Sequence, residues 1–158
     1  MTTAIEVSIC CEAWLARCPD AAMLAESAAR AALSEAARGI VGIVLTDDDE
    51  QRQLNHEFRG KDAPTNVLSF ALAEEGGTAP AGAPALLGDV VLAFETVARE
   101  AAEQQKRLAD HLCHLVVHGV LHLLGFDHES DAEAAMMETR EIEILETLGV
   151  PDPYRDTM

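Results

Sequence analysis

The sequence lacks the features that mark several common classes of protein. No apolar run approaches the roughly 20 residues that a membrane-spanning helix needs, so we expect no membrane association. The first residues show no basic segment followed by an apolar one, so we expect no signal peptide and a cytoplasmic location. None of the four cysteines forms a C-x-x-C pair, which predicts free, buried thiols rather than disulfides or a cysteine metal site.

Basic residues are also scarce in this chain. It has 11 Lys and Arg against 28 Asp and Glu, which gives a formal net charge of −17. Charge-driven binding to DNA depends on neutralising phosphates with basic side chains, so we expect no non-specific DNA binding. A local basic groove or a bound metal ion can still supply positive charge.

The 158 residues, 49% of them hydrophobic, suffice for one domain with a real core. Apolar runs predict strands near residues 5–9, 40–45, 66–70 and 86–94. Helical periodicity and capping signals predict helices near residues 20–37, 46–58, 95–107, 108–124 and 130–148. The order lacks strict strand–helix–strand regularity. We therefore expect a single α+β domain over residues 1–158, with a small mixed sheet of about four strands packed with about five helices.

Local signals refine three of these helices. Thr46 is the expected N-cap of the second helix, and Ser130 with Glu133 forms a capping-box pattern at the start of the last. The helix over residues 108–124 is apolar nearly all round, so it is expected at the centre of the fold, and Gly125 ends it.

The segment from His118 to His128 carries the strongest chemical signal. His118 and His122 are four residues apart and share one helix face, close enough to bind one ion. Gly125 lets the chain turn back, which can bring His128 beside them. Three neutral imidazoles leave positions open for water, as in a catalytic zinc site, although several other divalent ions suit such a site equally well.

Neighbouring residues leave alternatives open. His111 and His114 are expected to be exposed polar residues or to support the ligands, and ligation by His114 is the less favoured reading. Asp127 either orients an imidazole or caps the loop. The histidine spacing also occurs in metzincin peptidases, but their general base, a Glu after the first histidine, is here Gly119.

A second segment concentrates cations in an acidic chain. Arg52, Arg59 and Lys61 lie within ten residues of one another. The guanidinium group can grip a phosphate with two hydrogen bonds, whereas the plainer alternative for each side chain is a surface salt bridge.

Together these two segments resemble the YbeY family of single-strand-specific endoribonucleases. The family pattern H-G-x-L-H-L-x-G-(Y/F)-D-H is complete from His118 to His128. The family's L-N-x-x-(Y/F)-R segment matches residues 54–59, and its L-G-D-(I/V) strand matches residues 87–90. The family's P-T-D-V-L-S-F matches residues 64–70 except that its Asp is Asn66 here, which keeps a hydrogen-bond acceptor but loses the charge.

The resemblance implies one metal ion, usually zinc, held by His118, His122 and His128, with Arg59 in the cleft as the catalytic contact to RNA phosphate. Asn66, Asp127 and Lys61 are weaker candidates for supporting the ligands or binding substrate. The resemblance further implies maturation of the 16S rRNA 3′ end and ribosome quality control, with small-subunit ribosomal proteins or an assembly GTPase as partners.

Three functions follow as hypotheses. The first is a metal-dependent endoribonuclease that hydrolyses single-stranded rRNA. The second is a non-catalytic ribosome-assembly factor with a structural metal, because an acidic protein can dock on basic ribosomal proteins. The third, a metallopeptidase, requires Glu at position 119 and is the least favoured.

Overall fold

Four strands and six helices make up the described part of the chain, which comprises residues 3–33, 39–59, 66–71, 86–124 and 130–154 of a computed structural model. The strands are β1 (Thr3–Ile9), β2 (Gly39–Thr46), β3 (Val67–Ala71) and β4 (Leu86–Ala93). The helices are α1 (Ala13–Arg17), α2 (Ala21–Leu33), α3 (Asp48–Arg59), α4 (Phe94–Glu103), α5 (Leu108–Leu123) and α6 (Asp131–Thr147).

The strands form one mixed sheet in the order β1-β2-β4-β3. β1, β2 and β4 are parallel, and β3 pairs with β4 in the antiparallel direction. The α+β prediction with a small mixed sheet of four strands is therefore confirmed. Among the described helices, the short α1 is one that the sequence pattern did not predict.

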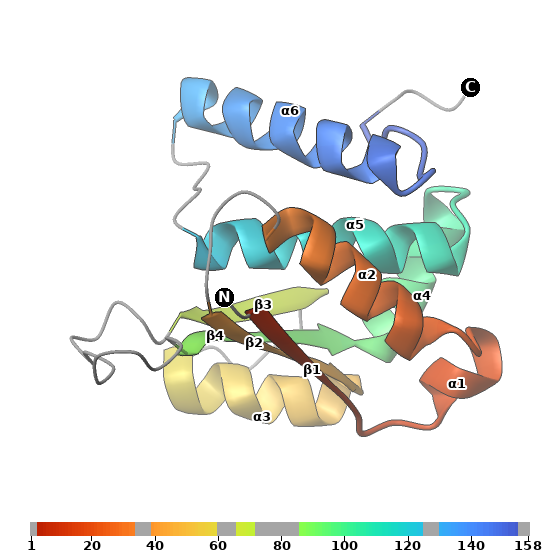
Figure 1. Cartoon of the computed structure of the whole chain (residues 1–158). Helices are drawn as coiled ribbons and strands as arrows, with labels where there is room; N and C mark the ends of the chain where they lie inside the picture. The colour runs from red at the N-terminus through yellow and green to blue at the C-terminus, as the bar shows by residue number, and fades with distance from the viewer. Residues whose placement is uncertain (1–2, 34–38, 60–65, 72–85, 125–129, 155–158) are drawn as a thin grey trace.

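The helices cover both faces of the sheet (Figure 1). α3 lies on one face, α2 and α5 lie on the other, and α6 packs on the side of α5 away from the sheet. α5 is therefore enclosed between the sheet, α2 and α6. Eleven of its 16 residues are buried, which confirms the expectation of a central helix.

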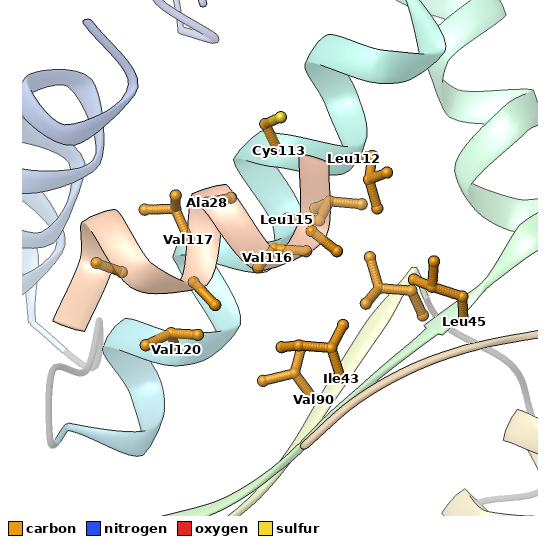
Figure 2. Packing of buried hydrophobic residues seen from close by; sticks show 14 of the residues in the cluster. Ala28, Ile43, Leu45, Val90, Leu112, Cys113, Leu115, Val116, Val117 and Val120 are labelled. Atoms are coloured by element: carbon orange, nitrogen blue, oxygen red, sulfur yellow. The ribbon is translucent and has the colours of Figure 1, made fainter. Parts of the chain in front are cut away.

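The core lies between α5 and the middle of the sheet. Ile43, Leu45 and Val90 point from β2 and β4 toward Leu112 and Val116 of α5 (Figure 2), and all five are fully buried. On α2 the buried positions are mostly alanines, which we call the alanine face: Ala21, Ala25, Ala28, Ala29 and Ala32. Such short side chains let two helix axes approach closely. Residues 34–37 of the predicted α2 fall outside the described residues.

The N-cap of α3 differs from the predicted residue, whereas the N-cap of α6 is the predicted one. The expected N-cap Thr46 is wrong, because Thr46 is still the last residue of β2 and Asp47 Oδ1 accepts the hydrogen bond from Glu50 N at 2.8 Å. The capping box of α6 is confirmed, since Ser130 Oγ accepts from Glu133 N at 3.1 Å and Glu133 Oε1 accepts from Ser130 N at 3.3 Å.

Two further expectations can be compared with the described residues. All four cysteines are free thiols, as expected, but only Cys18 and Cys113 are buried, whereas Cys10 is exposed and Cys11 is partly exposed. In the parts of the chain that the structure describes, no helix is both long and apolar enough to cross a bilayer.

Gly119 sets how closely α5 approaches the sheet. A Cβ atom at this position would lie 2.6 Å from Val90 Cγ1 and 3.1 Å from Ser69 Oγ. Ser69 Oγ also donates a hydrogen bond to the Gly119 carbonyl oxygen at 3.0 Å. The absence of a side chain therefore brings the backbone of α5 within hydrogen-bonding distance of β3.

We expect Gly119→Ala to destabilise the protein. Overpacking costs about 1–3 kcal/mol, which outweighs the gain of about 1 kcal/mol in helix propensity. The measurement is urea unfolding followed by the fluorescence of the single, fully buried Trp14. Val90→Ala is the matched background, since it removes the nearest clashing atom and should shrink the penalty. A Gly119→Ala protein more stable than the wild type would contradict this account.

Candidate metal centre

Four histidines follow one another along α5. The ring centroids are 6.1 Å apart for His111 and His114, 6.3 Å for His114 and His118, and 4.6 Å for His118 and His122. This succession follows from residue spacings of three and four, which place side chains on one face of a helix. Of the two alternatives for His111 and His114, exposure is wrong, because only 2% and 9% of their surfaces are exposed. The alternative that they support the ligands stays a prediction.

His118 and His122 meet through the nitrogens that ligate metals. Their Nε2 atoms lie 3.1 Å apart. Two nitrogens that bind one tetrahedral zinc ion at about 2.0–2.1 Å are separated by about 3.3 Å, so the observed separation is close to that of a ligand pair. The side chain of His118 is 24% exposed, which leaves this end of the centre accessible to solvent.

Glu141 of α6 holds the other nitrogen of His118. Glu141 Oε2 lies 2.6 Å from His118 Nδ1, and Glu141 Oε1 lies 2.9 Å from His114 Nε2. An ionised carboxylate only accepts hydrogen bonds, so both imidazole nitrogens donate to it. With the proton of His118 on Nδ1, its Nε2 carries the lone pair that a metal ion requires.

Tyr154 completes the environment of this carboxylate. Its hydroxyl donates to Glu141 Oε1 at 2.5 Å. Burial alone would raise the pKa of Glu141, but hydrogen bonds from His114, His118 and Tyr154 lower it to about 2. Burial and the neighbouring carboxylate in turn raise the pKa of Tyr154 above its ordinary value. Glu141 is therefore ionised and Tyr154 is a neutral donor at neutral pH.

The described residues offer two places for an ion. One lies where a single ion would contact the Nε2 atoms of both His118 and His122. The other is the group of His114, His118 and Glu141, whose ligand atoms all lie within 4.8 Å of one another. In that group the close pairs, at 2.6 and 2.9 Å, are already hydrogen bonds between a carboxylate and imidazole N–H groups. We favour the pair of His118 and His122 as the described part of a metal site, because their Nε2 atoms are about as far apart as two nitrogen ligands of one ion.

The other predicted site residues divide into two groups. His128, Asp127 and Lys61 lie outside the described residues. Arg59 is the last residue of α3, and its side chain is likewise outside the described part. Their predicted roles stay predictions.

Asn66 is described, and it belongs to a second carboxylate network. Its Nδ2 donates to Glu100 Oε1 at 2.9 Å, and the same oxygen lies 3.0 Å from His111 Nε2. Burial lowers the pKa of His111 despite the opposing effect of Glu100, so this imidazole is neutral at neutral pH. This network meets α5 at His111, two helical turns before His118. The predicted role of Asn66 in supporting a ligand or binding substrate stays a prediction.

The sequence analysis missed Glu141 and Tyr154. Glu141 occupies an apolar position of α6, four residues after buried Met137 and four before buried Leu145. A carboxylate in such a stripe signals a buried partner, so this residue could have been found. For Tyr154 no comparable signal exists, because it follows the last helix.

The position of Gly119 also bears on the peptidase hypothesis. A side chain there would point at Val90 and Ser69 in the sheet. A general base placed after the first histidine would therefore face the sheet, which argues against peptidase chemistry at this centre.

We expect the Glu141 network to dominate acid stability. Because the pKa of Glu141 falls from 4.5 to about 2 on folding, its stabilising effect is full above about pH 4.5 and fades as the pH falls toward 2. Glu141→Gln should remove about 2 kcal/mol of the stability change between pH 5 and pH 3. Unfolding free energies between pH 5 and 3 test this, with exposed Glu143→Gln on the same helix as control. Equal slopes in all three proteins would contradict the assignment.

Comparison with known proteins gives a consistent assignment. The family model described as endoribonuclease YbeY matches residues 9–149. A protein from Paramagnetospirillum magneticum named endoribonuclease YbeY is 54% identical over 98% of this chain and 97% of its own. A Rhodopseudomonas palustris protein of the same name is 48% identical over 97% of this chain and 93% of its own.

A solved structure shares the fold. The solution structure of TM1509 from Thermotoga maritima is 26% identical, aligns over 96% of this chain and 97% of its own, and gives a TM-score of 0.57. The motif from His118 to His128, the described fold and the match over most of the chain agree, and this chain belongs to the YbeY family.

Proposed function

We propose that this protein is a metal-dependent endoribonuclease that hydrolyses single-stranded RNA in the maturation of the 16S rRNA 3′ end. Family membership and the name shared by its relatives support RNA cleavage. The observation that carries the metal dependence is the 3.1 Å approach of the His118 and His122 Nε2 atoms. A role in ribosome quality control in the cytoplasm, with small-subunit proteins or an assembly GTPase as partners, is part of the same proposal.

The chain's own histidines would hold the ion. His118 and His122 present their Nε2 atoms from consecutive turns of α5, and His128 would supply the third imidazole. This donor set suits zinc and leaves positions for water and substrate. A divalent ion bound there supplies a Lewis acid and lowers the pKa of water toward neutrality. Glu141 keeps the proton of His118 on Nδ1, so that its Nε2 carries a lone pair that could bind the ion.

Arg59 would act on the phosphate. It ends α3, and the planar guanidinium group suits two hydrogen bonds to phosphate oxygens. Charge that develops on the phosphorane oxygens would be stabilised by this cation. With a net charge of −17 the protein repels RNA as a whole, so Arg59 and Lys61 would provide local attraction.

The same net charge favours the second candidate, a non-catalytic assembly factor whose metal is structural. Such a protein would dock on basic ribosomal proteins through its acidic surface. The two candidates differ in one result. The endoribonuclease cleaves RNA and loses this activity with its metal or with Arg59, whereas the folded assembly factor cleaves no RNA.

We expect the purified protein to cleave a labelled single-stranded RNA oligonucleotide and to lose this activity with a chelator. His118→Ala should reduce cleavage by about 10³-fold or more, because the ligands act as a unit. His56→Ala, a substitution at an exposed histidine of α3, is the matched control and should be active. Cleavage that survives both the chelator and His118→Ala would refute metal-dependent hydrolysis and indicate a contaminating nuclease.

We expect Arg59→Ala to reduce cleavage by about 10²–10³-fold while the metal content per chain is unchanged. The reason is that Arg59 contacts phosphate rather than the ion. Arg30→Ala is the control, since Arg30 forms an exposed ion pair with Glu26 on α2. Parallel metal analysis of both variants separates the two effects. Normal cleavage by Arg59→Ala would exclude the assigned contact, whereas absence of cleavage in every protein would favour the assembly factor.

A further inference from the structure

We infer that Tyr154 is a positioning residue of the metal centre and acts on His118 through Glu141. The inference rests on the proposed function in one respect, which is that His118 binds a metal ion. It assigns a role to the turn after α6, which lies beyond the histidine motif in the sequence. The hydrogen bonds of the turn, of the carboxylate and of the imidazole carry the argument.

The turn is held in place from two sides. Asp152 Oδ1 accepts a hydrogen bond from Tyr154 N at 2.8 Å, which closes the turn on itself. Lys106 Nζ donates to the Pro153 carbonyl oxygen at 3.0 Å, which ties the turn to the connection between α4 and α5. These two contacts fix the point from which the tyrosine ring extends.

The ring then lies against α5. Tyr154 and His114 pack edge to face, with centroids 5.4 Å apart and planes at 82°. The tyrosine is 44% exposed, so it closes the Glu141 network at the surface rather than filling the core. Removal of its hydroxyl alone should therefore leave the fold intact.

The two oxygens of Glu141 have different partners. Oε1 accepts from Tyr154 at 2.5 Å and from His114 at 2.9 Å, whereas Oε2 accepts from His118 at 2.6 Å. Two donors on one oxygen restrain rotation of the carboxylate, and the other oxygen faces His118. Tyr154 therefore restrains the group that restrains the imidazole.

This restraint matters because a neutral histidine has two tautomers. When Nδ1 carries the proton, Nε2 has a free lone pair and can bind a metal ion. A mobile carboxylate would hold Nδ1–H less well, so more of the free protein would carry the proton on Nε2. Partners of this kind typically change metal affinity by about 10–100-fold.

Tyr154→Phe in the full chain tests the inference. It removes the hydroxyl and keeps the ring, and Glu143→Gln on the solvent side of α6 is the control. We expect Co²⁺ to bind about tenfold more weakly to Tyr154→Phe in a competition titration with a chromophoric chelator. We also expect long-range ¹H–¹⁵N spectra of the metal-free protein to show less of the Nδ1–H tautomer at His118. The control should match the wild type in both measurements.

A second variant guards against a misfolded protein. Lys106→Met frees the turn and keeps the phenol, so it should weaken Co²⁺ binding in the same direction and by a smaller factor. Unchanged Co²⁺ affinity together with an unchanged His118 tautomer in Tyr154→Phe would overturn the inference. Two equivalents of Co²⁺ per wild-type chain would overturn it as well, because His114, His118 and Glu141 would then ligate directly.

The two readouts also separate this inference from the proposed function. The tautomer of His118 is measured without metal, so it tests the chain of hydrogen bonds even if the protein cleaves no RNA. A wild-type protein that binds no Co²⁺ would refute the metal centre and, with it, the proposed function. Less of the Nδ1–H tautomer at His118 in Tyr154→Phe would still show that Tyr154 orients this imidazole through Glu141.

Discussion

The structure depends on the carboxylate of Glu141, which is buried between α5 and α6. Glu141 is fully buried, and an ionised group in such a place is tolerated only when hydrogen bonds replace the lost water. Two imidazoles of α5 and one phenol from the following turn provide those bonds. The same three contacts join α6 and the turn to α5, so they contribute both to the electrostatics of the centre and to the packing of the C-terminal part.

Much of the fold followed from patterns that are local in the sequence. Apolar runs predicted the four strands, and the nearly all-round apolar character of residues 108–124 predicted the central helix, because both arise from burial of neighbouring residues. The start of α3 was misplaced because Thr46 is bound by tertiary structure: its carbonyl accepts from Trp14 Nε1 at 2.9 Å, from 32 residues away. Contacts of that range leave no trace in a window of ten residues.

The candidate site likewise combines features that are local in the sequence with contacts between distant residues. The pairing of His118 and His122 follows from helical geometry alone, and the structure places their Nε2 atoms 3.1 Å apart. The partners of His111 and His114 were not foreseen, because Glu100 and Glu141 reach α5 from other helices. A polar residue in a buried helix needs a hydrogen-bond partner from another element. The sequence shows that such a partner is required but does not show which residue it is.

The alanine face of α2 affects the position of the metal-centre histidines on α5. Four of its five alanines have no exposed surface at all, and α2 is a direct neighbour of α5. The interior is close-packed, so there is no space for a methyl or methylene group added at one of these alanines. Such a substitution would displace α5 and, with it, the imidazoles of the metal centre. The geometry of the metal centre thus depends on α2, although α2 contributes no ligand atom to it. A variant of α2 that loses metal affinity would do so because α5 is displaced.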